Sequence, residues 1–286
     1  VLTLAAVSVG ACIAFESLFN IIRKKKNTAG DFSCVVTGLL LVMCLPVTAP
    51  YWLVVVGDFF AIVVVKMLFG GIGKNFFNPA LAARAFLFSW PAIMTKFVVP
   101  FKSSVIPVFG AVPEDVVDAV SSATPLTFLK TGTLPDVSMA DLFFGNVGGC
   151  IGEISAAALL LGGFYLLFRK IITWHIPVCY IGTVALITFI FPASGGFFDL
   201  DFMLCELLSG GLLLGAFFMA TDYTTSPVTS KGRIIYGIGC GLLTVFLRYF
   251  GGYPEGVSYA ILLMNVFAFA LDKMVRPRRY GAGGEI

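Results

Sequence analysis

The chain has 286 residues, of which 58% are hydrophobic and 12% are charged, and its formal net charge is +3. Soluble domains carry roughly 25% charged residues, so this composition excludes a water-soluble enzyme, a nucleic-acid-binding protein and a disordered chain. The abundant Phe (29 residues) and Gly (31 residues) fit a membrane protein, in which small residues let helices approach one another closely.

Nine apolar segments are long enough to cross a hydrocarbon core of ~30 Å. In chain order, we predict spans at 1–22, 34–49, 51–69, 79–99, 142–168, 176–192, 204–221, 233–250 and 257–274. The second span is short and contains Pro46, so we expect it to be broken or tilted. The chain starts at Val1 inside an apolar run, and we expect its natural N-terminus to be missing. The sequence thus predicts an all-α polytopic membrane protein with about nine to ten transmembrane helices, which form a single transmembrane domain over residues 1–286.

The basic residues fall mainly on one side of this predicted bundle. Alternating the spans places thirteen Lys and Arg residues on the side of Arg23–Lys26 and the C-terminus, and four on the other side together with eight acids. The positive-inside rule makes the first side cytoplasmic. The polar stretch at about 100–141 is then an extracytoplasmic loop, and long loops without secondary structure are often functional.

The two halves of the chain share a weak internal similarity. Thr-Gly-Leu-Leu-Leu at 37–41 resembles Gly-Gly-Leu-Leu-Leu at 210–214, and each is followed by an apolar span and a Phe-Gly-Gly turn, at 69–71 and 250–252. The predicted topology puts the two turns on opposite sides of the membrane. Inverted repeats with broken helices are typical of transporters; chance similarity among Gly-, Leu- and Phe-rich segments is the alternative.

Several ionisable residues lie in or at the ends of the predicted spans. A charge at the bilayer centre costs at least ~2.5–3.5 kcal/mol, so such groups pair, face a cavity or serve a function. Lys66 and Glu206 lie within about one turn of a span end, and we expect them to reach the interface. Asp58 and Glu153 lie deeper, and for these we expect either a place on an ion path or a buried ion pair.

Asn78-Pro79 marks the start of a helix, with Asn78 as N-cap and Pro79 at the first helical position. Two interpretations remain open. The segment is a plain cap, or it is a partly unwound region whose N–H groups, with nearby Arg84, hold an anionic or carbonyl-rich ligand.

The external loop contains the sequence Asp-Ala-Val-Ser-Ser-Ala-Thr at 118–124, followed by Pro125. Composition alone indicates a turn or a helix cap. The segment resembles the D-x-x-[ST]-G-A-T motif, at which a flavinyltransferase joins FMN through its phosphate to the final threonine. Asp118, Ser121, Ala123 and Thr124 match this motif, and Ser122 stands where Gly is usual.

Further blocks extend the resemblance over about residues 1–280. The segments 70–80, 218–227, 232–241 and 251–260 are similar to those of the NqrB/RnfD family, the flavin-bearing membrane subunits of the Rnf ferredoxin:NAD oxidoreductase and of the sodium-pumping quinone reductase. This resemblance implies an electron-transfer subunit in a prokaryotic cell membrane, with other subunits as partners and with Na⁺ or H⁺ as the transported ion. The resemblance also implies covalently bound FMN. The NqrB branch of the family binds riboflavin noncovalently as well, so riboflavin is a second possible cofactor. The implied FMN segment comprises the attachment residue Thr124 and its neighbours Asp118, Ser121, Ser122, Ala123, Pro125 and Thr127.

A redox-free channel or secondary transporter built from inverted repeats fits the broken helices equally well. The segment 118–127 separates the two hypotheses, because a simple channel needs no flavin attachment site. The sequence has no P-loop and no C-x-x-C pair, so electrons are expected to arrive from and leave to neighbouring subunits. We interpret the seven cysteines as small buried hydrophobic residues.

Overall fold

The computed structural model describes residues 1–26, 28–97, 124–253 and 255–275, and this part of the chain contains helices but no strand. The first group of helices comprises α1 (Leu2–Ile22), η1 (Ala29–Asp31), α2 (Ser33–Met43), α3 (Tyr51–Phe59), its π-helical continuation η2 (Phe60–Met67), α4 (Pro79–Leu87) and α5 (Pro91–Met94). The remainder comprises α7 (Pro125–Lys130), α8 (Met139–Phe144), α9 (Ala156–Phe168), α10 (His175–Ile190), α11 (Leu200–Leu208), α12 (Leu212–Leu214), the π-helical η3 (Gly215–Met219), α13 (Ser230–Phe250) and α14 (Val257–Met274).

Three of the described helices, α1, α13 and α14, are long and apolar enough to cross a membrane by themselves. A fourth span results if α11 and the α12–η3 segment are counted together, although the two are bent by 63°. The helical membrane class is therefore supported. The predicted number of nine to ten spans is not confirmed, because the other apolar segments form shorter helices.

Two predicted spans are wrong as continuous helices. In the span 79–99, helix α4 ends at Leu87, and Pro91 starts the separate helix α5. A proline in a helix interior removes a hydrogen bond and clashes with the preceding turn, so the helix cannot continue through it. In the span 142–168, α8 ends at Phe144 and is capped by Gly145, whose φ of +100° is left-handed, and regular helix resumes only at Ala156.

Two other segments differ from simple spans or loops. The expected break in the span 34–49 is confirmed, since α2 ends at Met43 and the chain turns before α3 begins at Tyr51. The polar stretch 100–141 is not entirely loop, because α7 and the start of α8 lie in its C-terminal part. The residues of this stretch before 124 lie outside the described part of the chain.

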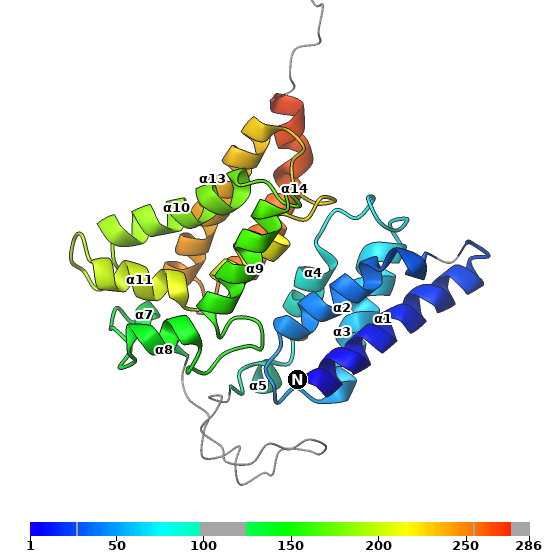
Figure 1. Cartoon of the computed structure of the whole chain (residues 1–286), viewed down its shortest axis with the longest axis horizontal. Coiled ribbons are helices and arrows are strands. Elements are labelled where there is room, and N and C mark those ends of the chain that lie inside the picture. Colours follow the sequence, from blue (N-terminus) through cyan, green and yellow to red (C-terminus); the bar gives the residue numbers. More distant parts are fainter. Residues whose placement is uncertain (27, 98–123, 254, 276–286) are drawn as a thin grey trace, which may run out of the picture.

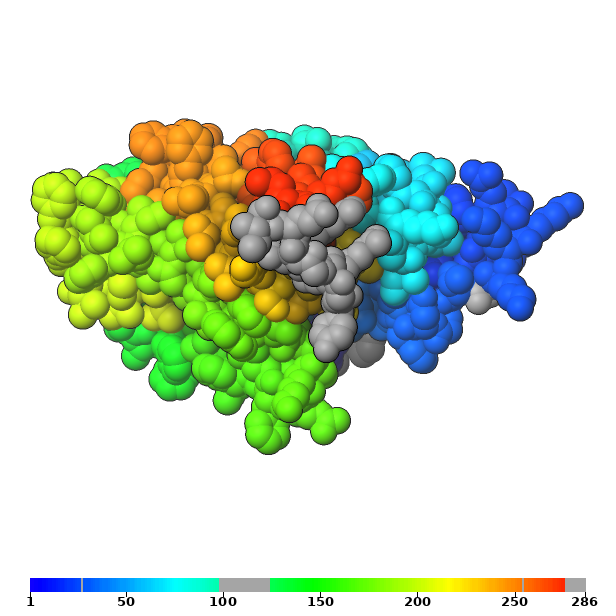
Figure 2. All heavy atoms as spheres, turned by 90° about the horizontal axis from the view of Figure 1, so that it is seen from above, coloured from blue at the N-terminus to red at the C-terminus, as the bar shows by residue number. Residues whose placement is uncertain are grey.

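The helices are arranged in two groups that lie side by side (Figure 1). Helices α1 to α5 form one group, in which α1 packs against α2 and α3, and α4 packs against α2, α3 and η2. The second group is built around α10, α13 and α14, and the contact of α4 with α14 joins the groups. Viewed from above, the blue-to-cyan segments of the first group lie beside the C-terminal helices (Figure 2).

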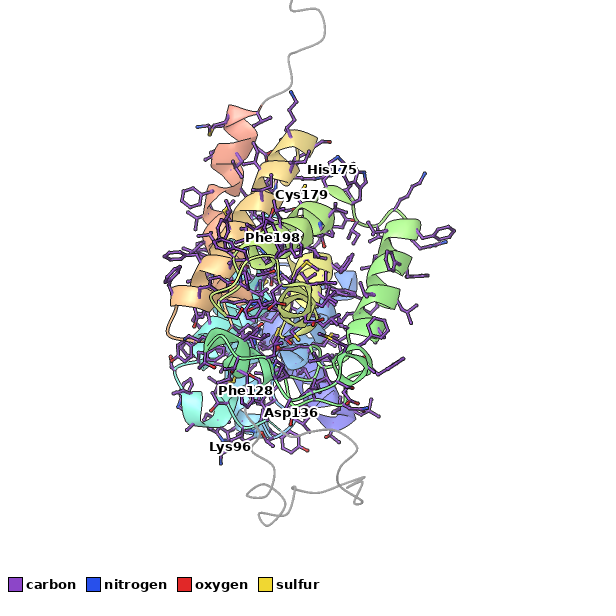
Figure 3. All side chains as sticks on the ribbon, turned by 90° about the vertical axis from the view of Figure 1, so that its left-hand side faces the viewer. Lys96, Phe128, Asp136, His175, Cys179 and Phe198 are labelled. Carbon is purple, nitrogen blue, oxygen red and sulfur yellow. The ribbon has the colours of Figure 1, made fainter. Side chains whose placement is uncertain are left out.

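The polar segments lie at opposite ends of the molecule. Lys96, Phe128 and Asp136 lie at one end, and His175 lies toward the other (Figure 3). At the end of His175, α14 also caps the start of α13, because the Asp272 carboxylate accepts hydrogen bonds from the backbone N–H groups of Val228 and Thr229 at 3.0–3.1 Å.

Helices α10 and α13 have the most extensive contact of any pair of described helices, and two glycines one turn apart make this contact possible. A Cβ on Gly237 would lie 2.9 Å from Cys179 Cβ, and one on Gly241 would lie 2.6 Å from Thr183 Cβ and 3.0 Å from the Tyr180 carbonyl oxygen. Small residues four positions apart let helix backbones approach in membranes, where packing rather than the hydrophobic effect drives association. The two glycines therefore fix the distance between these helices.

We predict that Gly241→Leu destabilises the protein, because the new side chain must push α10 away from α13. Overpacking of this kind costs roughly 1–3 kcal/mol, and we expect a lower melting temperature of the purified chain in detergent. Gly182→Leu on α10 is the matched control, because a Cβ at Gly182 has no neighbour within 4 Å. Equal melting temperatures of the two variants would contradict this account of the packing.

Candidate functional site

Thr124 lies at the start of α7, and its hydroxyl is not used to cap the helix. It is the N-cap residue of this helix and Pro125 is the first helical residue, but the Thr124 side chain makes no capping hydrogen bond. The hydroxyls of Thr124 and Thr127 lie 3.0 Å apart, and Thr124 is half-buried. The preceding motif residues, Asp118 to Ala123, lie outside the described part of the chain.

Helix α7 is held firmly although it is short. Leu126 and Leu129 are buried in a cluster with residues of α8 and α11. Lys130 Nζ donates hydrogen bonds to the carbonyl oxygens of Gly251 at 2.5 Å and Gly252 at 3.0 Å. These contacts attach the end of α7 to the turn between α13 and α14, so Thr124 at the start of α7 has a defined position on the bundle.

An open cavity lies beside Thr124, which forms part of its lining. Its wall combines the start of α7, the irregular segment before α9, the break between α11 and α12, and the side chains of α4. Two aromatic rings, Phe88 and Tyr253, form part of the lining, with their centroids 5.3 Å apart.

Arg84 of α4 is the positive group in this cavity. It is 3% exposed and donates hydrogen bonds to Glu153 Oε1 at 3.1 Å, to Ser258 Oγ at 2.9 Å and to the Glu255 carboxylate. Its guanidinium carbon lies 5.7 Å from the centroid of the Phe88 ring. One arginine thus holds two carboxyl groups, and with both of them ionised this local group would carry one more negative than positive charge.

Two buried polar atoms beside the cavity have no partner among the described residues. They are Arg84 Nε and Ser209 Oγ, and both residues line the cavity. Buried polar groups in native structures are nearly always hydrogen-bonded, so each exception calls for an explanation. Two unused hydrogen-bonding groups beside aromatic rings fit a planar ligand that carries several acceptor oxygens or nitrogens.

Asn78 has the capping role that its position predicts. Its Oδ1 accepts hydrogen bonds from the backbone N–H groups of Ala80 at 3.0 Å and Leu81 at 3.3 Å, while its Nδ2 lies 3.4 Å from the Met219 carbonyl oxygen. These N–H groups are therefore not free to hold a ligand. Arg84, one turn further along α4, contacts the cavity group described above, so the structure does not join Asn78 and Arg84 in one ligand site.

The expected interfacial position of Lys66 and Glu206 is wrong. Lys66 is 3% exposed and lies 2.6 Å from the Glu16 carboxylate, and Glu206 is 1% exposed and pairs with Arg248. Each side chain points into the bundle, where a neutralising partner removes the need to reach water.

Asp58 and Glu153, which the sequence groups together, lie in different surroundings. Glu153 belongs to the Arg84 group. Asp58 of α3 is fully buried against α1, with its Oδ1 2.7 Å from Ser8 Oγ and 3.3 Å from Cys12 Sγ. Glu153 is thus a member of a buried ion pair, whereas Asp58 is held by neutral side chains.

Sequence reasoning missed Glu255, which it counts only among the external acids. The carboxylate of Glu255 contacts both Arg84 and the backbone N–H of Gly211, the latter at 3.0 Å. The one local signal is that Glu255 follows the Phe-Gly-Gly turn immediately before an apolar helix. That signal does not identify the partner, because Arg84 is 171 residues away in the sequence.

The NQR2, RnfD, RnfE family model matches residues 1–281 of this sequence. The chain belongs to this family. This match confirms the resemblance that the sequence blocks at 70–80, 218–227, 232–241 and 251–260 indicate.

Several curated proteins are similar to this NQR2, RnfD, RnfE family member along most of its length. The D subunit of the Na⁺-translocating ferredoxin:NAD⁺ oxidoreductase complex of Acetobacterium woodii is 49% identical over 286 residues, which cover 98% of this chain and 82% of the relative. The D subunit of the proton-translocating ferredoxin:NAD⁺ oxidoreductase complex of Clostridium ljungdahlii is 42% identical, with 95% and 81% covered. The D subunit of the ion-translocating oxidoreductase complex of Escherichia coli O7:K1 is 37% identical, with 96% and 85% covered.

Proposed function

We propose that this chain is the flavin-carrying D subunit of a membrane complex that couples electron transfer between ferredoxin and NAD⁺ to ion transport. The family and the names of three relatives support the complex. The cavity at Thr124 carries the flavin part of the proposal, because a hydroxyl in the position of the attachment motif lies at the edge of an open cavity that is lined by the aromatic rings of Phe88 and Tyr253.

Thr124 is the proposed attachment residue for FMN. A phosphoester needs a hydroxyl that a modifying enzyme can reach, and the Thr124 hydroxyl is not used for capping. A flavinyltransferase is the proposed partner for this modification. FMN bound there would supply the capacity to accept and pass on electrons.

The residues of the cavity suit a flavin ring system. Phe88 and Tyr253 offer aromatic faces, against which a planar ring stacks favourably. Arg84 offers a positive charge and an unpaired Nε, and Ser209 offers an unpaired hydroxyl, to the polar edge of the ring. Among the proposed flavin ligands, Arg84 is therefore retained, and Asn78 is assigned to the helix cap.

We place the Thr124 end of the molecule outside the cytoplasm. The excess of Lys and Arg at the ends of the spans supports this orientation. Lys96 and Asp136 lie at the end opposite His175, as the alternating topology requires (Figure 3). A transferase that works outside the cytoplasm then has access to the hydroxyl, and the C-terminus lies in the cytoplasm.

The Arg84 group is the proposed place where electron transfer affects ion binding. Arg84 neutralises only one of the carboxylates of Glu153 and Glu255, so the group favours an additional cation or proton. Reduction or oxidation of a flavin in the adjacent cavity would change the charge there and so alter the affinity of the Arg84 group for that cation or proton. The named relatives differ in their ion, Na⁺ in one and protons in another, so we propose monovalent cation transport without choosing between them.

A denaturing gel tests the flavin proposal. The chain is expressed with its flavinyltransferase, and the gel is viewed for flavin fluorescence before staining. We expect a fluorescent band and, in mass spectrometry, a peptide containing Thr124 that carries the mass of FMN. A chain without attached flavin would favour the redox-free channel or transporter, for which the bent α11–α12 segment provides the structural argument.

We predict that Glu153→Gln slows ion transport several-fold in vesicles that contain the whole complex, while covalent flavin is retained. The substitution removes the excess negative charge of the Arg84 group and preserves the shape of the side chain. Asp136→Asn is the matched control, because Asp136 is an exposed acid at the same end of the molecule. Equal transport rates in both variants would remove Glu153 from the ion path.

A further inference from the structure

Asp58 differs from the other buried acids of the described residues. Glu16, Glu153 and Glu206 are each paired with a basic side chain, respectively Lys66, Arg84 and Arg248. Asp58 has no basic partner in the described part of the chain, and its Oδ2 has no hydrogen-bond partner there. An unpaired ionised carboxylate in an apolar interior is so costly that such a group becomes neutral instead.

The number of hydrogen-bond donors around Asp58 indicates that its carboxyl group carries a proton. Ser8 Oγ lies 2.7 Å from Asp58 Oδ1 and 3.0 Å from the Gly38 carbonyl oxygen. Serine has a single O–H hydrogen, so it can donate to only one of these two oxygens. If Asp58 were ionised, one of the two oxygen–oxygen contacts would lack a hydrogen. A hydrogen on Asp58 Oδ1 completes the chain, in which Asp58 donates to Ser8 and Ser8 donates to Gly38.

We infer that Asp58 is a proton-binding site, occupied in this conformation as a neutral carboxylic acid whose Oδ1–H donates to Ser8. Cys12 then donates its weak S–H bond to the same oxygen, at 3.3 Å. The proton comes from a hydronium ion of the solvent: one of its O–H bonds breaks, an O–H bond forms at Asp58 Oδ1 and water is left, and the proton leaves by the reverse step. The role of this site in ion transport rests on the proposed function, whereas its occupancy by a proton does not.

The surroundings favour a proton over a metal cation. The side chains that reach Asp58 are one hydroxyl and one thiol, and a thiol is a poor ligand for hard cations, which prefer several oxygen ligands. Gly38 brings α2 close enough to seal this face, since a Cβ there would lie 3.0 Å from Ser8 Oγ and 3.1 Å from Cys12 Sγ. The space beside Asp58 is therefore suited to a hydrogen atom.

The basic groups on the helices around Asp58 are each bound to a carboxyl group of another residue. From α1, Cys12 faces Asp58, and one turn further along lies Glu16, which is bound to Lys66 of η2. From α2, the Gly38 carbonyl faces the site, with Cys34 buried near Cys12. Helix α4 contributes Arg84, which is bound to Glu153 and Glu255. None of these groups supplies a free positive charge to Asp58.

Infrared spectroscopy of the purified complex tests the inference directly. We expect the wild type at neutral pH to show the carbonyl band of a protonated carboxylic acid, which shifts on transfer to heavy water and is absent in Asp58→Asn. Asn is the matched replacement, because it is neutral and nearly isosteric with the protonated acid. A spectrum of Asp58→Asn identical to that of the wild type would overturn the inference.

Two further samples make the result decisive. Ser8→Ala removes the hydrogen-bond acceptor and is expected to shift the band to higher frequency, which serves as the test if Asp58→Asn does not assemble. Adding Na⁺ at constant pH is expected to leave the band unchanged, and its loss would identify a metal cation site instead. If the complex expressed with its flavinyltransferase showed this band but carried no covalent flavin, the proton site would be supported and the flavin proposal contradicted, so the two failures are distinguishable.

Discussion

Replacing Thr124 by Ala is expected to abolish covalent flavin completely. Alanine has no hydroxyl, so no phosphoester can form, and the effect does not depend on how tightly the flavin ring fits the cavity. The fold should be retained, because the Thr124 side chain makes no capping bond, and its hydroxyl contact with Thr127 lies in an exposed region. The measurement is in-gel flavin fluorescence, normalised to the amount of protein in the band.

Two variants control this experiment. Thr124→Ser keeps a hydroxyl at the same position and is expected to retain fluorescence at least in part. Thr127→Ala removes the neighbouring hydroxyl, which lies 3.0 Å away, and is expected to leave the fluorescence unchanged. Undiminished fluorescence in Thr124→Ala, or its loss in Thr127→Ala, would assign the attachment to a different residue.

Local patterns in the sequence predict part of this structure well. The helix start at Asn78-Pro79 is confirmed in detail, because N-capping depends only on residues within one turn. The break near Pro46 is confirmed for the same reason. The breaks at Pro91 and Gly145 were equally visible in the sequence, but an apolar run alone does not reveal whether such a residue ends a helix.

Long-range partners are the part that sequence patterns do not predict. The contacts of Arg84 with Glu153 and Glu255 join residues 69 and 171 positions apart, and Lys66 reaches Glu16 across 50 positions. No periodicity encodes such pairs, so the sequence placed Lys66 at the interface and overlooked Glu255. The candidate site was predictable as the segment around Thr124, but the cavity beside it depends on the tertiary packing of α4, α7 and the break after α11.

The buried pairs add to the internal similarity of the two halves. Lys66 lies shortly before the Phe-Gly-Gly turn at 69–71, and Arg248 lies shortly before that at 250–252. Both are almost fully buried, and each is bound to a buried glutamate on an earlier helix. The inverted orientation of the two halves stays a prediction. In both halves, however, a basic residue near the end of a span is buried and paired with a glutamate of an earlier helix.

The Arg248 pair should have the largest effect on stability, because Arg248 stabilises a break in the backbone as well as a charge. Its Nη1 donates to the Glu206 carboxylate and, at 2.7 Å, to the Glu206 carbonyl oxygen, while its Nη2 donates to the Ser209 carbonyl oxygen at 3.2 Å. These carbonyls belong to the last turn of α11 and the residue after it, where the helix bends and no further turn satisfies them. The Arg248 side chain therefore caps the C-terminal end of α11 at the break.

We predict that Arg248→Met lowers the free energy of unfolding by roughly 3–5 kcal/mol, the usual cost of leaving one partner of a buried pair uncompensated. Thermal unfolding of the purified chain in detergent measures this effect, and Lys231→Met, at an exposed position on the same helix, is the matched control. The double variant Arg248→Met/Glu206→Leu is expected to recover only part of the loss, because it removes the unpaired charge but still leaves both carbonyls without a donor. Full recovery would mean that charge alone matters, and a double-variant loss equal to the sum of the two single losses would mean that the two side chains do not interact energetically.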